Sequence, residues 1–206
     1  MITLGSAFYY EMSGGSLVAN CHKMPANMFT KKMGTVEEVI SVMDNMIHRL
    51  LFFNPNIKLI LTVSPVRHLR EGLVENNYSK ATLIYAVHHL VRKFENLDYF
   101  PAYELVIDDL RDYRFYAEDM VHPNYLATAY VWEKFSESCL DPNLGSFMKE
   151  VDLIHNAMNH RAFNPESEAH LRFLNASLER VNQLQQLYPS LDFSWESNFF
   201  RQSLKP

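Results

Sequence analysis

The run Ile57–Val63, Ile-Lys-Leu-Ile-Leu-Thr-Val, restricts the possible folds of this 206-residue chain more than any other segment. Five of its seven positions are apolar, which is typical of a central strand covered on both faces in a parallel sheet. Met1–Tyr10 and Tyr99–Ile107 also read as strands, and amphipathic helical patterns separate the three. This alternation of strands and helices predicts a doubly wound α/β sheet with parallel strands.

The helix before Ile57–Val63 has the clearest boundaries. Thr35 and Glu38 form a capping-box pattern at its start, and Asn54-Pro55-Asn56 ends it. The helix after the strand is expected to run from an N-cap at Ser79 to about Asn96. One face of each helix is apolar, with Val36, Val39, Ile40, Met43, Ile47, Leu50 and Leu51 on the first and Leu83, Val87, Leu90 and Phe94 on the second.

The pattern changes after Asp141-Pro142. Two amphipathic helices follow, the first with an apolar face from Leu144 to Met158 and the second capped near Asn164-Pro165-Glu166. We therefore predict an α/β domain over residues 1–140 and a helical hairpin over 141–206 that packs on it as an extension. The last residues, 198–206, are expected to be loose.

Composition excludes several classes of protein. The net charge is −5 and no basic stripe is present, which argues against nucleic-acid binding. No apolar run approaches the length that spans a membrane. Cys21 and Cys139 give neither a disulfide framework nor a metal-binding spacing, which fits a reducing compartment, and we expect a cytoplasmic location.

Polar residues gather where the predicted strands end. Gly5 and Ser6 form a turn in the first strand, Asn20 follows a short extended piece, and Ser64 and Arg67 follow the central strand. Open α/β sheets bind ligands at the carboxyl ends of their strands. These five residues are therefore candidates for substrate binding. For Arg67, a salt bridge within a loop is an equally good interpretation.

Asp119-x-x-His122-Pro123 is the strongest catalytic candidate. A helix is predicted from Asn124 to about Leu140, with His122 at its N-cap and Pro123 at its first position. A carboxylate that holds one imidazole nitrogen while the other faces a cleft orients a general base. A bare D-x-x-H pattern is more often a structural capping pair, so this assignment depends on its context.

Several blocks together supply that context, and they resemble the bacterial GSCFA family over residues 1 to about 175. The family is grouped with the SGNH, or GDSL-like, serine esterases and acylhydrolases. The blocks, in order, are Ile2–Ala7, Ala19–Lys23, Thr62–His68, Asn77–Thr82, Tyr99–Glu104 and Asp109–Tyr116, followed by His122-Pro123.

The resemblance implies a flavodoxin-like sheet and a Ser–His–Asp triad acting on an acyl ester, without metal or cofactor. By resemblance, His122 is the base and Asp119 orients it. Gly5-Ser6-Ala7 falls where SGNH enzymes carry a Gly-x-Asn block whose Asn donates to the oxyanion. Ala7 occupies the Asn position, so Asn20 or the Ser6 hydroxyl is left as an alternative donor.

The chain departs from the family at its start. The Gly-Ser-Cys-Phe-Ala stretch with the expected nucleophile is absent, and the sequence resembles a family member that begins at the third strand. Ser6, Ser64 and Cys21 beside His22 are poor substitutes, so no residue is assigned as the nucleophile. We expect an incomplete esterase or acylhydrolase, or alternatively a non-catalytic interaction module. An exposed edge at Met1–Tyr10 would favour self-association.

Overall fold

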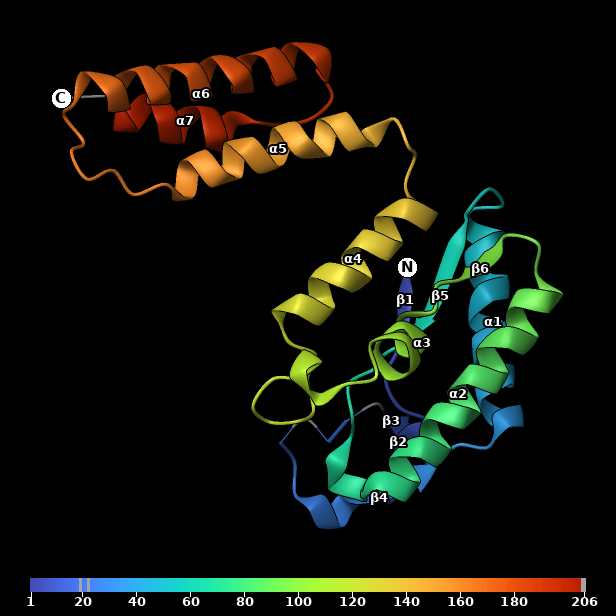
Figure 1. The fold of residues 1–206 in the computed structure, drawn as a ribbon. Helices are drawn as coiled ribbons and strands as arrows, with labels where there is room; N and C mark the ends of the chain where they lie inside the picture. The colour runs from blue at the N-terminus through green and yellow to red at the C-terminus, as the bar shows by residue number, and fades with distance from the viewer. Residues whose placement is uncertain (19, 22, 205–206) are drawn as a thin grey trace. The chain divides into compact units, whose positions relative to one another are not determined.

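The computed structural model describes residues 1–18, 20, 21 and 23–204. The chain forms two compact units, Met1–Ser136 and Glu137–Pro206. The first unit contains all the strands of the described residues, and the second contains helices (Figure 1).

The first unit is built on a three-stranded parallel sheet in the order β1-β5-β6. Its strands are β1 (Ile2–Leu4), β5 (Leu59–Val63) and β6 (Leu97–Tyr99). Leu61 is aligned with Ile2 on one side and with Tyr99 on the other. Leu61 and Val63 are fully buried, so the prediction of a central, two-sided strand is confirmed. The predicted α/β class is confirmed at this level.

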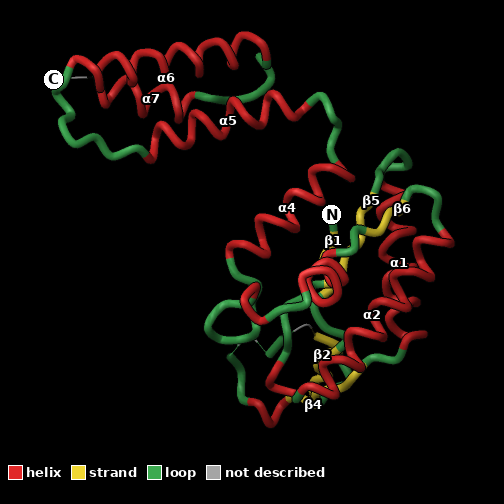
Figure 2. The backbone as a smooth tube through the Cα atoms, viewed as in Figure 1, coloured by secondary structure: helices red, strands yellow, loops and turns green. Residues whose placement is uncertain are grey.

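A second, antiparallel sheet was not predicted. It has the order β3-β2-β4 and comprises β2 (Phe8–Met12), β3 (Leu17–Val18) and β4 (Phe29–Met33), the last preceded by the short helix η1 (Ala26–Met28) (Figure 2).

The prediction of one strand over Met1–Tyr10 is therefore wrong, because β1 and β2 belong to different sheets. Two hydrogen bonds explain the break between them. The Ser6 hydroxyl accepts from the Phe8 amide at 3.1 Å, and the Ser79 hydroxyl accepts from the Ala7 amide at 2.7 Å. The amide of Ala7 is thus bonded to a helix, while its carbonyl oxygen accepts from the Gly34 amide just after β4.

Helices α1 (Val36–Phe53) and α2 (Leu73–Lys93) lie together to one side of the parallel sheet, and α4 (Tyr125–Cys139) lies to the other (Figure 1). The capping box of α1 is present as predicted, with both Thr35–Glu38 hydrogen bonds formed. The start predicted for α2 is wrong. After the short helix η2 (Leu69–Glu71), α2 begins at Leu73 behind Gly72, whose φ of +88° is one that glycine adopts without strain.

The core between α1, α2 and the sheet contains the predicted apolar residues. Met43 and Ile47 of α1 are buried together with Leu83, Val87, Leu90 and Phe94. The remaining predicted residues of α1 are half-buried around them.

The strand predicted for Tyr99–Ile107 is wrong after its first residue. β6 ends at Tyr99, and a helical segment follows that consists of α3 (Ala102–Glu104) and the π-helical turn η3 (Leu105–Leu110). Pro101 lacks the amide hydrogen that a longer strand would donate. A 3-10 turn, η4 (Tyr113–Phe115), then leads into the loop before α4.

The second unit contains α5 (Leu144–Asn159), α6 (Glu168–Leu187) and α7 (Ser194–Ser203). The predicted hairpin corresponds to α5 and α6, with Ser167 rather than Asn164 as the N-cap of α6. The expectation of a loose end is wrong for residues 198–203, because they belong to α7 and Phe200 is completely buried in one cluster with Ile154 and Leu184. Residues 205 and 206, to which the expectation also applied, lie outside the described residues. Among the described residues, no helix combines the length and the apolarity needed to cross a bilayer.

Candidate functional site

Asp119 and His122 form the predicted pair. Asp119 Oδ2 lies 2.6 Å from His122 Nδ1, while Oδ1 accepts from the backbone amides of Val121 and His122 at 2.9 and 3.0 Å. The hydrogen bonds from the His122 amide and ring, followed by that from Val121, lower the pKa of Asp119 to about 2. The His122 side chain remains 61% exposed, so the pair is oriented but open to solvent.

The pair is held in a short closed loop. Tyr116 and Pro123 form an isolated antiparallel bridge, and the Ala117 amide donates to the His122 carbonyl at 2.8 Å. Met120, between the two members of the pair, has a left-handed φ of +57°, which is a strained value for a non-glycine residue. The carboxylate bonds described above stabilise this turn.

His122 and Pro123 do not begin α4 as predicted. The helix starts at Tyr125, and the Asn124 side chain accepts from the Ala127 amide at 3.2 Å, which is the bond of an N-cap. Pro123 instead lies in the bridge with Tyr116. His122 is therefore fixed by its loop rather than by the helix end.

Arg67 joins the end of β5 to this loop. Its guanidinium donates to the Met120 carbonyl at 3.0 Å and lies over the Tyr116 ring, 4.4 Å from the ring centroid. The salt bridge considered for Arg67 is absent from the described residues, where the charge rests on an aromatic face. Arg67 thus brings a strand-end residue and the Asp119–His122 loop together.

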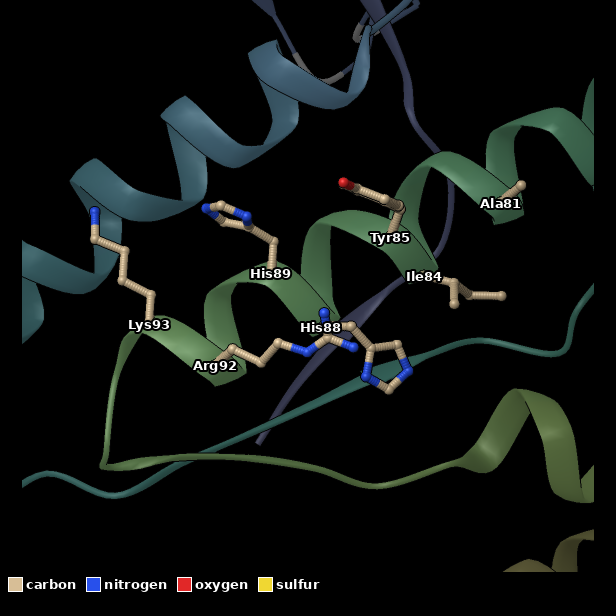
Figure 3. Close-up of a pocket in the computed structure, with 7 residues that line it drawn as sticks. All are labelled: Ala81, Ile84, Tyr85, His88, His89, Arg92 and Lys93. Carbon is tan, nitrogen blue, oxygen red and sulfur yellow. The ribbon is translucent and has the colours of Figure 1, made fainter.

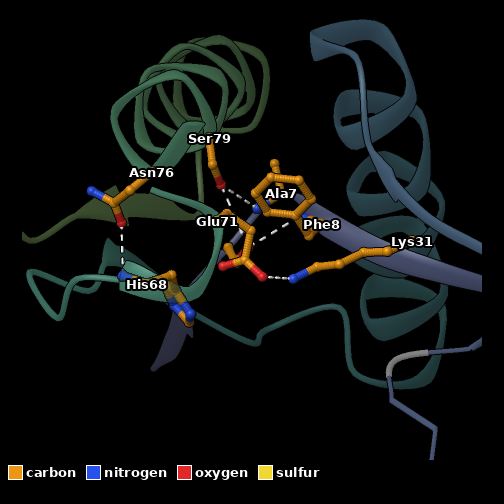
Figure 4. Close-up of polar contacts among 8 residues, drawn as sticks. Ala7, Phe8, Lys31, His68, Glu71, Asn76 and Ser79 are labelled. Carbon is orange, nitrogen blue, oxygen red and sulfur yellow. Dashed lines mark hydrogen bonds and ion pairs between the residues drawn. The ribbon is translucent and has the colours of Figure 1, made fainter. Parts of the chain in front are cut away.

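Three side chains on one face of α2 form hydrogen bonds with backbone groups near the ends of the strands. Asn76, Ser79 and Lys80 are 5%, 3% and 1% exposed. Lys80 Nζ donates to the carbonyl oxygens of Gly5 and Ser64, both at 2.6 Å. Ser79 accepts from Ala7, as described above, and Asn76 accepts from the His68 amide at 2.9 Å (Figure 4). We call these three residues the polar face of α2.

Burial changes the acidity of this region. Desolvation lowers the pKa of the Lys80 ammonium to about 8. Desolvation also lowers the pKa of His68, and the charges of Lys80 and Lys31 add to that effect. Lys31 itself is paired with Glu71 (Figure 4). The site therefore combines a buried cation below the strand ends with an anion, Asp119, in the exposed loop.

The predicted site residues are distributed as follows. Gly5 and Ser64 are joined through Lys80, and the Ser6 hydroxyl lies 3.5 Å from that of Ser79. Ser64 accepts from the Val66 amide at 3.2 Å. Asn20 is exposed on the segment that follows β3 of the antiparallel sheet.

The cysteine alternative cannot be followed further. Cys21 is half-buried, and His22, considered as its partner, lies outside the described residues.

Sequence reasoning missed the polar face of α2. Asn76-x-x-Ser79-Lys80 has the i, i+3, i+4 spacing that places side chains on one side of a helix. With an N-cap predicted at Ser79, Asn76 is expected to precede the helix. The helical spacing between Asn76, Ser79 and Lys80 is then not apparent from the sequence. The signal is a continuous helix through Asn76 whose buried residues change from polar to apolar after Thr82.

A concave surface of about 830 Å³ lies farther along α2, lined by Ala81, Ile84, Tyr85, His88, His89, Arg92 and Lys93 (Figure 3). His88 is half-buried against Tyr99, with the two ring centroids 4.7 Å apart, and His89 is exposed. Across the part of the chain that is described, no three His, Cys, Asp or Glu side chains are grouped so that they could hold a metal ion.

Comparison with known families gives two matches. Residues 1–135 match the GSCFA family, and residues 151–206 match the C-terminal domain of GSCFA domain proteins. A search of curated proteins and a search of solved structures each found no match. The first match contains the polar face of α2, Arg67 and the Asp119–His122 loop, and it extends over more than half of the chain. The chain therefore belongs to the GSCFA family.

Proposed function

We propose that this chain carries the histidine–carboxylate part of an SGNH-type serine esterase, acylhydrolase or acyltransferase site on a flavodoxin-like sheet. The observation that carries the proposal is the 2.6 Å contact between Asp119 and His122 Nδ1. The second carboxylate oxygen is held by two backbone amides, which fixes the direction of the first. Such an arrangement is that of an oriented general base.

In the proposed reaction, His122 Nε2 removes the proton from a serine hydroxyl as its oxygen attacks the ester carbonyl. The tetrahedral intermediate collapses, and the protonated imidazole returns the proton to the departing alkoxide. Water, or another alcohol in a transferase, then attacks the acyl-serine with the same base. Asp119 holds the imidazole and stabilises its protonated form. No residue of this sequence is assigned as the nucleophile.

Gly5, Ser6, Ser64 and Arg67 are proposed to line the substrate side of this site. The polar face of α2 holds the backbone at Gly5, Ala7 and Ser64 rigidly, which is what a preorganised site requires. Arg67 links that side to the base through Met120.

The alternative is a non-catalytic module that associates through the sheet edge. β1 is the terminal strand of the parallel sheet, and an apolar groove of about 680 Å³ lies beside it, lined in part by Leu4, Phe8, Val42 and Met43. An edge of this kind favours strand pairing with another chain.

Ester turnover distinguishes the two functions. Hydrolysis of p-nitrophenyl acetate would be measured for the wild type, His122→Ala and Asp119→Asn, with the exposed His89→Ala as a control. Loss in the first two variants with retention in the control is the expected result. Absence of turnover by folded wild-type protein, or turnover that is indifferent to His122, would reject the enzyme and favour the module.

Fluorophosphonate labelling with peptide mapping would accompany the assay. A labelled serine whose modification requires His122 would identify the nucleophile within these residues.

A further inference from the structure

A groove of about 580 Å³ adjoins the Asp119–His122 loop. Arg67, Leu69, Gly72, Leu73, Tyr113 and Met120 line it. These residues come from four separate segments, namely the end of β5, the η2–α2 connection, η4 and the Asp119–His122 loop. The volume is within the range of about 300–1,000 Å³ that is typical of small-molecule sites.

The walls of the groove are apolar side chains that remain in contact with solvent. Leu69, Leu73, Tyr113 and Met120 are 45%, 63%, 63% and 50% exposed. Single exposed apolar residues need no explanation, but a group of them around one concave surface marks an interaction site. The group lies beside the loop that carries the proposed base.

Two features of the backbone fix the shape of the groove. Met120 is fixed by its left-handed turn and by the bond from Arg67 to its carbonyl oxygen. Gly72 has φ +88°, and a Cβ at that position would have no neighbour within 4 Å. The chain therefore reverses at Gly72 without placing a side chain in the groove.

Arg67 gives the groove polarity. Among the described residues, it is the one charged side chain that lines the groove. Its guanidinium bears five N–H donors, one of which is directed at the Met120 carbonyl oxygen. The other N–H groups can donate to a carbonyl or other oxygen of a ligand at the end of the groove nearest the loop. A ligand with an apolar body and an oxygen-bearing end matches this arrangement.

We propose that this groove binds the apolar group of the ester substrate, with the ester oxygens towards Arg67. The identity of the ligand as an ester rests on the proposed function, but the binding of an apolar group does not. The groove thus predicts a preference for esters of medium-length aliphatic acids over acetate.

Binding of an uncharged probe tests the groove without any chemistry. The shifts of the Leu69 and Met120 methyl signals would be followed while 1-hexanol is added to the whole chain. The variant is Leu73→Asp and its matched control is Val74→Asp. Val74 is 79% exposed and does not line the groove, and both substitutions place a carboxylate in the first turn of α2, where the helix dipole favours it.

We expect hexanol to bind saturably and its affinity to fall at least about tenfold in Leu73→Asp, as loss of one leucine contact implies, with little change in Val74→Asp. Equal weakening in both variants, or shifts that do not saturate, would overturn the proposal.

Ester assays separate this inference from the proposed function. Turnover that requires His122, with the same hexanoate-to-acetate preference in the wild type and Leu73→Asp, would reject the groove and keep the enzyme. Leu73-dependent hexanol binding without His122-dependent turnover would keep the groove and reject the enzyme.

Discussion

The side-chain nitrogen of Lys80 donates to the carbonyl oxygen of Gly5 at 2.6 Å, although the two residues are 75 positions apart in the sequence. The same nitrogen donates to the carbonyl oxygen of Ser64 at the same distance. One buried side chain of α2 thus fixes the loops that follow two adjacent parallel strands.

Lys80→Met is expected to lower the free energy of unfolding by about 1–3 kcal/mol, measured by urea denaturation at pH 7. Two buried carbonyl oxygens lose their donor, and relief of the buried charge offsets part of that loss. Lys93→Met on the same helix is the control. Lys93 is 45% exposed and paired with Asp44, so its loss should change stability by less than about 1 kcal/mol.

The loss in free energy of unfolding caused by Lys80→Met should become larger between pH 8 and pH 10.5. Burial lowers the pKa of Lys80 from 10.5 to about 8, so in that interval the unfolded chain binds more protons at this position than the folded chain. Stability from this group therefore rises with pH, because the neutral amine still donates while its charge is no longer buried. A difference between wild type and variant that shrinks over the interval would contradict this assignment.

Asp119→Asn is expected to loosen the Asp119–His122 loop above pH 4 and to have little effect on it near pH 2. The pKa of Asp119 is lowered from 3.8 to about 2, so its carboxylate stabilises the folded loop above the unfolded pKa. That contribution is lost as the pH falls through the folded pKa. Hydrogen exchange of the Val121 and His122 amides would report it, with the exposed neighbour Glu118→Gln as a control.

Arg67→Ala should increase the exchange of the same two amides without exposing the core. The substitution removes the donor to Met120 and the contact with the Tyr116 ring. A charge-assisted hydrogen bond is worth about 1.5–3 kcal/mol, and partial exposure places this one at the lower end. Arg70→Ala, an exposed arginine in η2, is the control. Unchanged exchange would mean that the loop is held by its own bonds.

Phe200→Ala is expected to destabilise the second unit by about 3–5 kcal/mol, because the side chain is completely buried between helices. In the whole chain, the amides of Ile154 and Leu184 should exchange faster. Trp195→Ala, in the same helix but 67% exposed, should have a small effect. Equal effects of the two substitutions would indicate that α7 does not pack as described.

The sequence predicts correctly those features that depend on interactions between residues close in sequence. The Thr35–Glu38 capping box and the Asp119–His122 contact each depend on residues close in sequence, and both are present. The break between β1 and β2, in contrast, involves a partner that is distant. Nothing near Gly5 indicates that Ala7 bonds to Ser79, 72 residues away, so the break between β1 and β2 could not be read from the strand itself.

The polar face of α2 was not predicted for the same reason. Asn76, Ser79 and Lys80 resemble a helix start until the loops that cover them are known. Polar residues at core spacing are informative only when a distant backbone needs donors or acceptors, and here the carbonyls of Gly5 and Ser64 need a donor and the amides of Ala7 and His68 need acceptors.

The Lys80–Gly5 bond has a consequence for folding kinetics. Asp119 and His122 are three residues apart, so their contact can form in a chain that is otherwise unfolded. The contact between Lys80 and Gly5 requires closure of a loop of 75 residues, and such distant pairings form late and slow the folding of the whole chain. The orientation of His122 is therefore independent of the loop closure that assembles the strand-end half of the site.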